Sequence, residues 1–215
     1  MAYTEHYFTH FETGCFYHVY NRSVDKKPMF KNIGNYEYFL RKYDQYLSGV
    51  ADTYAYCLLG NHFHLLVRIR DLTDLTTFQK LSNLNAPNAA KNKTPHDIVS
   101  HQFQKFFQSY AMSFNKQHSR IGTLFHTPFK RALVNNYQYY KQVIYYIHAN
   151  PQQHGLITDF RDWKWSSYSR FLIDSVTKLK KQEVLNWFGS KDDYLKYHSD
   201  TKNANNSKLF DIDDE

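Results

Sequence analysis

The chain has 215 residues, and its 27 lysine and arginine residues against 20 aspartate and glutamate residues give a formal net charge of +7. Aromatic residues make up 18% of the chain and the mean hydropathy is −0.69, a composition that excludes both a disordered chain and a membrane-spanning helix. Two cysteines cannot form a disulfide framework and the first ten residues hold no apolar signal segment, so we expect a cytoplasmic protein.

The residue pattern predicts four strands and three helices. Strands are expected at residues 16–20, 54–59, 63–69 and 131–134, and helices at residues 36–47, 98–116 and 137–149. Gly60 and Asn61 form the two-residue connection of a hairpin between the second and third strands. Pro151 is expected to end the last helix, because the residue before a proline is pushed out of the helical region. The order β-α-β-β-α-β-α is typical of the α+β class, with a ferredoxin-like split βαβ antiparallel sheet and helices on one face.

The length favours one domain with an appendage over two full domains. We expect the domain over residues 1–177 and a C-terminal extension over residues 178–215 that ends in a disordered acidic tail, with a loop over residues 82–95. Residues 201–215 hold two lysines against four acidic residues, so residues 1–200 carry a net charge of +9. A basic, aromatic-rich domain favours a polyanion as its partner, and single-stranded nucleic acid suits both properties.

His62 and His64 follow the predicted hairpin turn as a His-Phe-His run. Alternate residues of a strand point to the same face, so both imidazoles are expected on one side of the sheet and Phe63 on the other. Two neutral imidazoles a few ångströms apart make half of a site for a divalent metal. The alternative is a chance pair in a chain with 12 histidines.

Tyr146 and Asn150 lie one helical turn apart on the last predicted helix and therefore share a face. An asparagine carbonyl oxygen is a hard, neutral ligand that suits Mg²⁺ or Mn²⁺, and a tyrosine hydroxyl beside it is a candidate nucleophile. The alternative is ordinary packing. Ile144 and Ile147 fit the core side of the same helix, and composition cannot select one nucleophile among 19 tyrosines.

Residues 162–170 alternate aromatic side chains with basic ones. Such a pattern suits base stacking and phosphate contact, and it suits a small satellite core equally well. The candidate contacts for nucleic acid are Arg22, Lys130, Arg131, Trp163, Trp165, Tyr168 and Arg170. The sequence holds no phosphate-binding loop, dinucleotide-binding motif, nucleophile elbow or HExxH motif, which disfavours the enzyme classes that depend on them.

Taken together, these segments resemble those of a known family. Residues 56–67 (YCLLGNHFHLLV) resemble a strand-turn-strand with a His-hydrophobic-His (HUH) motif, and residues 146–156 (YIHANPQQHGL) resemble the helix of a catalytic tyrosine. Residues 163–168 (WKWSSY) resemble the segment that follows, and residues 17–22 (YHVYNR) resemble the first strand. The family is the REP-associated tyrosine transposases, relatives of the single-tyrosine insertion-sequence transposases, and the resemblance covers residues 14–172.

The resemblance implies a ferredoxin-like catalytic domain that nicks and rejoins single-stranded, hairpin-forming DNA as a transposase, through a 5′-phosphotyrosine intermediate. It assigns His62, His64 and Asn150 to a divalent cation, Mg²⁺ or Mn²⁺, and Tyr146 to the nucleophile, with Tyr145 as the neighbouring alternative. It implies no membrane partner, and it leaves open a monomer or a homodimer with the tyrosine acting in cis or in trans. Two other functions fit the same residues: a nucleic-acid-binding module without turnover, and a metal-dependent nuclease that uses water.

Overall fold

The structure is a computed structural model that describes residues 8–82 and 93–200. Its elements in chain order are β1 (Phe16–Arg22), η2 (Val24–Lys26), α1 (Ile33–Leu47), β2 (Ala51–Leu58), β3 (His62–Ile69), α2 (Leu72–Ser82), α3 (Pro95–Gln117), β4 (Lys130–Val134), α4 (Tyr137–Gln153), η3 (Phe160–Asp162), η4 (Tyr168–Phe171), α5 (Lys181–Phe188) and α6 (Lys191–Ser199). All the predicted strands and helices are present. α2, α5 and α6 are helices that no predicted element covers.

The four strands form one antiparallel sheet in the order β2-β3-β1-β4. α1 carries the chain from β1 to β2 across β3, and α3 carries it from β3 to β4 across β1. Each crossover therefore skips one strand, and two split βαβ units interlock in one sheet. The predicted ferredoxin-like fold class is confirmed.

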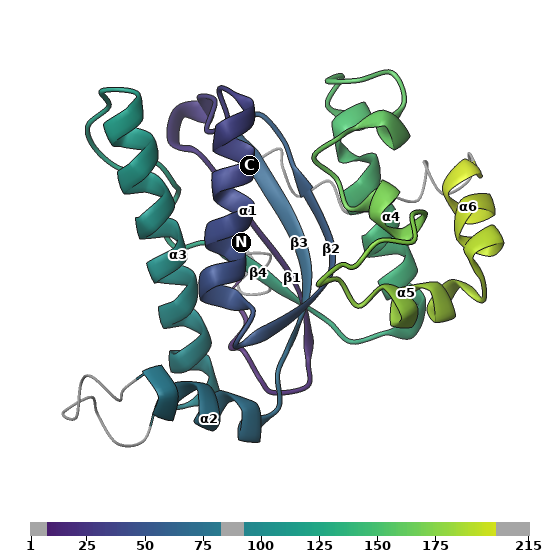
Figure 1. Ribbon diagram of the computed structural model, residues 1–215, viewed down its shortest axis with the longest axis horizontal. Coiled ribbons are helices and arrows are strands. Elements are labelled where there is room, and N and C mark those ends of the chain that lie inside the picture. The colour runs from purple at the N-terminus through teal and green to yellow at the C-terminus, as the bar shows by residue number, and fades with distance from the viewer. Residues whose placement is uncertain (1–7, 83–92, 201–215) are drawn as a thin grey trace, which may run out of the picture.

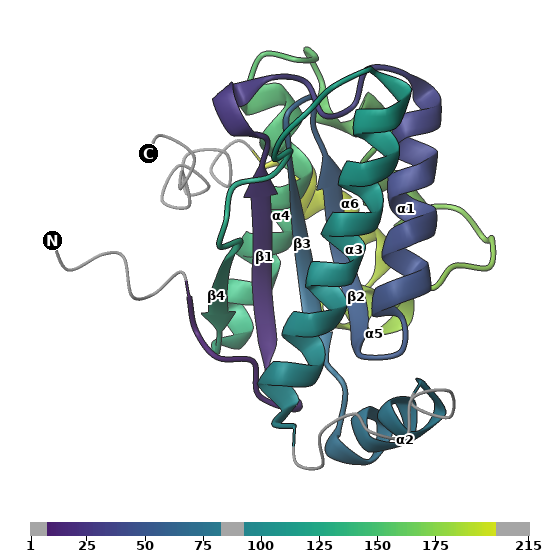
Figure 2. The ribbon, with the colours of Figure 1, turned by 90° about the vertical axis from the view of Figure 1, so that its left-hand side faces the viewer.

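α1 and α3 lie side by side over one face of the sheet (Figure 1, Figure 2). The core between them and the sheet is largely aromatic. The ring of Phe39 on α1 packs 5.1 Å from that of Phe63 on β3 and 4.8 Å from that of Phe106 on α3, centroid to centroid. All three rings are fully buried, and each such burial contributes about 1.5–3 kcal/mol. This core holds the middle strands, and with them the residues of the candidate site, in one position.

α4 packs on the opposite face of the sheet, against β2 and β3 (Figure 1). The expectation that the helices lie on one face is confirmed for α1 and α3 but is wrong for α4, which adds a third layer. The reason lies in the alternating residues of the strands, because those that point away from α1 and α3, such as Leu66 and Cys57, are also fully buried. A sheet that buries side chains on both faces needs a cover on both.

α4 runs through Pro151 to Gln153, so the prediction that the proline ends the helix is wrong. Pro151 stands in the last turn, where its ring removes only one backbone donor and few residues follow that need a straight continuation. A residue after the end of the helix closes this turn: the amide of Leu156 donates to the carbonyl of Pro151 at 2.8 Å. The extra turn matters for the site because it keeps Asn150 helical.

The segment that follows η3 covers the open edge of β2. The amide of Leu58 donates to the carbonyl of Trp165 at 2.9 Å, and the amide of Ser167 donates to the carbonyl of Tyr56 at 2.9 Å. The side chain of Ser167 in turn accepts a hydrogen bond from the amide of Tyr56 at 2.9 Å. A single antiparallel bridge between Ser166 and Cys57 thus ties this segment to the outer edge of β2.

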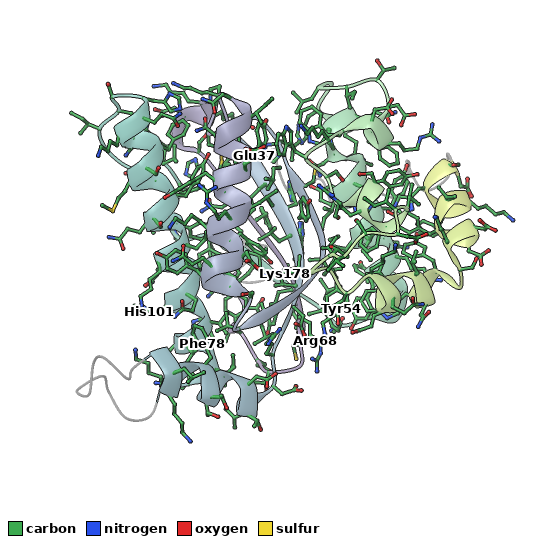
Figure 3. The ribbon with its side chains drawn as sticks, in the orientation of Figure 1. Glu37, Tyr54, Arg68, Phe78, His101 and Lys178 are labelled. Atoms are coloured by element: carbon green, nitrogen blue, oxygen red, sulfur yellow. The ribbon has the colours of Figure 1, made fainter. Side chains whose placement is uncertain are left out.

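Residues 178–200 fold onto the outer side of α4. Val184, Phe188 and Tyr194 belong to the same hydrophobic core as residues of α4. Lys178, which Figure 3 labels, forms an ion pair with Asp44 of α1 at 2.7 Å. The predicted acidic tail, residues 201–215, and most of the predicted loop at 82–95 lie outside the described residues. None of the described helices has the length and apolar character that crossing a membrane requires.

Candidate metal and nucleophile site

His62 and His64 stand at the start of β3 and turn their rings toward α4. Their ring centroids are 5.2 Å apart and the rings are almost perpendicular, while Phe63 between them is buried in the core under α1 and α3. His62 is 4% exposed and His64 is fully buried. The predicted alternation is confirmed, and the pair lies beneath α4.

Hydrogen bonds fix which nitrogen of His62 carries the proton. The side-chain amide nitrogen of Asn61 donates to the carbonyl of Lys26 at 3.1 Å, so the Asn61 amide oxygen faces His62 and accepts from Nδ1 at 2.6 Å. In a neutral imidazole Nε2 is then an acceptor. Nε2 lies 3.5 Å from Oδ1 of Asn150, whose own amide nitrogen points to the carbonyl of Tyr146 at 3.4 Å. When His62 is neutral, two acceptors therefore face each other, and a cation can bind to both.

His64 is oriented by a third histidine. Nδ1 of His64 lies 2.9 Å from Nε2 of His18, which stands on the neighbouring strand β1. For His64 to bind a metal through Nε2, its Nδ1 must carry the proton and donate it to His18. A partner of this kind fixes the tautomer and the ring direction of a metal-binding histidine.

Tyr146 and Asn150 lie on the face of α4 that meets these histidines. The ring of Tyr146 meets those of His18 and His64 edge-on, with centroids 5.7 and 5.5 Å apart. Tyr145 points the other way, toward Phe160 and α6, and burial raises the pKa of its hydroxyl. Between the two neighbouring tyrosines, the structure brings Tyr146 to the histidines.

Tyr146 and Asn150 are both fully buried, with no exposed side-chain surface. The candidate nucleophile is therefore enclosed between α4 and the sheet. A phosphate can reach its hydroxyl only if the ring or α4 shifts.

The side chains present fit a divalent cation. His62, His64 and Asn150 offer neutral nitrogen and amide-oxygen donors, which suit Mn²⁺ and similar ions. Among residues 8–82 and 93–200, no group of three His, Cys, Asp or Glu side chains is placed to hold a metal, so the Asn150 oxygen is essential to the candidate set. The facing acceptors of His62 and Asn150 are the observation that supports this fit.

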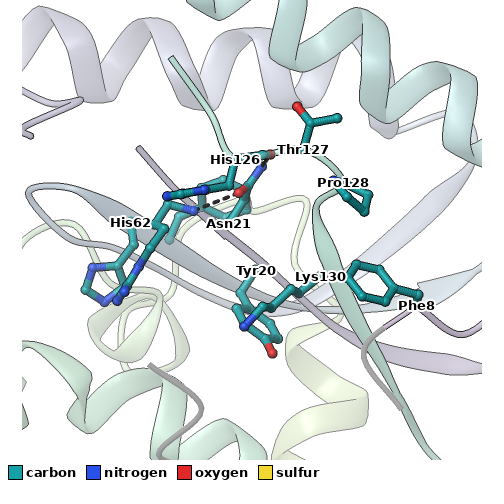
Figure 4. A pocket seen from close by; sticks show the side chains of 10 residues that line it. Phe8, Tyr20, Asn21, His62, His126, Thr127, Pro128 and Lys130 are labelled. Carbon is teal, nitrogen blue, oxygen red and sulfur yellow. Dashed lines mark hydrogen bonds between the residues drawn. The ribbon is translucent and has the colours of Figure 1, made fainter. Parts of the chain in front are cut away.

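Arg22 and Lys130 lie near these residues, as the nucleic-acid prediction requires. Both line a cavity of about 240 Å³ whose wall also includes His62 (Figure 4). Lys130 is paired across the sheet with Tyr20, and its Nζ lies 5.8 Å from the centre of the Tyr20 ring. Arg22 is paired with His62. Two of the predicted basic contacts are thus next to the candidate metal ligands.

The aromatic residues of the predicted set contribute mainly to packing. Tyr168 is only 4% exposed, so its ring has no face for a base. The Trp163 indole nitrogen donates to the carbonyl of Leu58 at 3.0 Å, and the Trp165 ring stacks on Tyr36 with centroids 4.3 Å apart. For Trp163 and Tyr168 the satellite-core alternative therefore describes this structure, because both rings lie in or against the core beneath α4.

Arg131 also has a structural role, in contrast to the predicted DNA contact. It is 8% exposed, its Nε donates to the carbonyl of Thr9 at 2.7 Å, and its guanidinium lies over the rings of Phe11 and Phe129. Burial lowers its pKa. Arg131 thus fastens the N-terminal segment to β4. Arg170 is exposed, but it lies on the far edge of β2, in a groove with Lys178 and Lys180.

The sequence prediction missed His18, Asn61 and Tyr20. Asn61 is next to His62 in sequence, but its role depends on the direction of its side chain in the turn. The register of β1 against β3 brings the other two to the site: Tyr20 faces His64, and His18 faces Leu66. The signal that was available is the alternation of polar rings in residues 16–22, where His18 and Tyr20 share a face.

Comparison with known proteins gives one informative result. No protein-family model matches the sequence, and no curated protein does. Among solved structures the chain is similar to that of a REP-associated tyrosine transposase bound to a REP hairpin, with a TM-score of 0.54 and 14% identity over 77% of this chain and 84% of the other. At this identity the likeness is one of fold.

Proposed function

We propose that the protein is a metal-dependent enzyme that nicks and rejoins single-stranded DNA, acting as a transposase on hairpin-forming DNA of the REP type. The observation that carries the proposal is the convergence of His62 Nε2 and Asn150 Oδ1, with the ring of Tyr146 against His64. A module that only binds DNA has no need of this combination. The fold likeness to a transposase is consistent with it.

Tyr146 is the proposed nucleophile. Its Oη attacks the phosphorus of a phosphodiester, the bond from phosphorus to the 3′-oxygen breaks, and the phenol proton ends on that oxygen. The products are a 5′-phosphotyrosine and a free 3′-hydroxyl. A cation held by His62, His64 and Asn150 would supply charge stabilisation at the phosphate and the leaving oxygen. Because one phosphoester replaces another, rejoining to a new 3′-hydroxyl needs no nucleotide triphosphate.

The burial of Tyr146 adds a step to this scheme. Its ring must leave the interface between α4 and the sheet before its oxygen meets DNA. We infer that DNA entry displaces the Tyr146 side chain or the part of α4 that carries it. DNA-dependent changes in hydrogen exchange of residues 146–153 are the expected sign.

The test is a covalent adduct. Protein, Mn²⁺ and a single-stranded hairpin DNA are incubated and then separated under denaturing conditions. A label at the 3′ end should migrate with the protein and a label at the 5′ end should not, because the tyrosine keeps the 5′-phosphate. Tyr146→Phe should abolish the adduct, and Tyr145→Phe, the matched control, should retain it. An adduct that persists in Tyr146→Phe would falsify this assignment of the nucleophile.

One observation favours a second candidate, a nuclease that uses water. With Tyr146 fully buried, a water molecule at the metal ligands is a competing nucleophile. Under this alternative the same incubation yields cut DNA and no adduct, and Tyr146→Phe cuts as well as the native protein.

A further inference from the structure

A gap in the sheet lies beside the candidate metal ligands. Pairing between β1 and β4 ends at Tyr20 and Lys130. The chain that leads to β4 meets β1 again farther along, where the amide of His126 donates to the carbonyl of Arg22 at 3.0 Å. Between these two points residues 127–129 swing away from β1, around a cis bond before Pro128. The gap beside Asn21 is the cavity that Figure 4 shows.

The walls of this cavity are mostly apolar and aromatic. Phe8, Phe63, Pro128 and the ring of Tyr20 form them, and polar groups stand among them on Asn21, His126 and Thr127. The Asn21 side chain is held by a hydrogen bond from its amide nitrogen to the carbonyl of His126, at 3.0 Å. Apolar and aromatic walls with a few fixed polar groups are typical of pockets that bind a small ligand.

The size and charge of the cavity indicate which kind of small ligand it suits. A volume of about 240 Å³ far exceeds the space of about 10–15 Å³ that a single water molecule requires, which leaves room for a ring the size of a pyrimidine base. Lys130 and Arg22 supply positive charge at the lining, and no carboxylate stands among the described residues that form it. An apolar slot with cations beside it suits a base that is attached to a phosphate.

We propose that this cavity receives one unpaired DNA base adjacent to the phosphate that is cut. The base lies between Tyr20, Phe8 and Pro128, while Lys130 and Arg22 hold the phosphates on either side of it. Because His62 belongs both to the cavity wall and to the candidate metal ligands, an inserted base fixes which phosphate lies at those ligands. The cavity would then determine the position of the cut. The inference rests on the proposed function in that it takes DNA as the ligand.

The test measures binding without cleavage. A fluorescent DNA hairpin with short oligothymidine arms is titrated in EDTA, and each arm position in turn is replaced by an abasic nucleotide. Removal of one particular base should weaken binding by about tenfold to a hundredfold, the range for loss of a stacked base. Thr127→Phe places a ring at the rim of the cavity. Thr123→Phe is the matched control, an exposed threonine of the same loop that does not line the cavity.

The proposal requires that the two changes interact. Thr127→Phe should weaken binding of the intact hairpin to the same extent as the critical abasic change, and should not weaken binding of that abasic hairpin further. Thr123→Phe should alter neither affinity. The absence of a sensitive position, or equal weakening of intact and abasic DNA by Thr127→Phe, would overturn the inference. Because this experiment measures no cleavage, its result does not depend on whether the covalent adduct forms. Formation of the adduct likewise does not depend on whether a base enters this cavity.

Discussion

Three histidines in one chain of contacts determine how the candidate site is oriented. His62 takes its tautomer from Asn61, and His18 is the partner that accepts the Nδ1 proton of His64 when His64 binds a metal through Nε2. Neither supporting residue is a candidate ligand. Supporting contacts of this kind raise the basicity of a ligand and hold its ring in place, and their loss typically weakens metal binding by about 10–100-fold.

Replacement of His18 tests this support at the level of one residue. His18→Phe fills the same space but cannot accept the Nδ1 proton of His64, so we expect Mn²⁺ affinity to fall by about 10–100-fold. His18→Gln offers an oxygen acceptor and should retain more of the affinity. Isothermal titration calorimetry with Mn²⁺ measures both.

The control for this series is His101→Ala. His101 is exposed on α3 and lies on the other side of the sheet from α4 (Figure 3). Its loss should leave Mn²⁺ affinity unchanged. A His18→Phe variant that binds Mn²⁺ like the native protein would show that His64 needs no partner on β1.

α4 is the element that connects the site to the C-terminal helices. Tyr146 and Asn150 face the sheet, whereas His148 between them points toward α6, where its Nδ1 lies 3.1 Å from Nε2 of His198. The other ring nitrogen of His148 lies 2.8 Å from the hydroxyl of Ser167. One helix thus carries the candidate nucleophile on one side and a buried polar contact on the other. The position of α4 therefore depends on its packing against the sheet and on the contacts of His148.

The buried contact makes stability depend on pH. Burial lowers the pKa of His198 from 6.5 to about 4, and that of His148 well below its ordinary value. Below pH 6.5 the unfolded chain binds a proton at His198 that the folded chain excludes. With respect to this group, the folded state therefore has its full stability above pH 6.5. It loses up to about 1.4 kcal/mol per pH unit as the pH falls from 6.5 toward 4.

Denaturant unfolding at several values between pH 7 and pH 4.5 checks this expectation. The native protein should lose stability with falling pH across that window, and His198→Phe should show a slope smaller by about 1 kcal/mol per pH unit. The comparison uses slopes, so a uniform loss of stability in the variant does not affect it. Equal slopes would mean that His198 is not the group that titrates.

At the scale of the whole molecule, only part of the positive charge lies beside the candidate metal ligands. The sequence places +9 on residues 1–200, yet Arg131 of the predicted set is used for packing and Arg170 lies at a distant edge. Lys130 and Arg22 remain beside the candidate ligands. Net charge therefore overstates the number of basic side chains that a DNA strand would meet at this site.

Salt dependence tests how Lys130 is used. A contact to one phosphate of single-stranded DNA contributes about 0.7 to the slope of log affinity against log salt concentration. Lys130→Met should weaken DNA binding and reduce the magnitude of that slope by about this amount. Lys105→Met removes an exposed charge from α3 and should leave the slope unchanged. Fluorescence anisotropy at several salt concentrations gives the slopes, and an unaltered slope in Lys130→Met would remove that lysine from the interface.

From the sequence, the presence of each helix and strand could be predicted better than its ends. The candidate metal ligands could be predicted better than the residues that orient them. Strand alternation suffices to place His62, His64 and Phe63, and helical spacing suffices to place Tyr146 with Asn150. The contact of His18 with His64 depends on the pairing of strands 46 residues apart, which no local pattern contains. The burial of Tyr168 likewise depends on helices near the C-terminus. The prediction that Pro151 ends α4 was wrong because it considered the helix alone. In the structure the last turn includes the proline and is closed by a hydrogen bond from Leu156.

The bridged segment at residues 163–167 has a consequence for self-assembly. It covers β2 through a pairing of Ser166 with Cys57, and at the opposite side of the sheet Phe8 pairs with Arg131 of β4. An uncovered edge strand is a template on which another chain adds its own strand. Because both outer strands are already occupied at these positions, a second copy cannot continue the sheet there. Strand addition by a second copy would therefore have to use other positions along these edges, such as the part of β4 beyond Arg131.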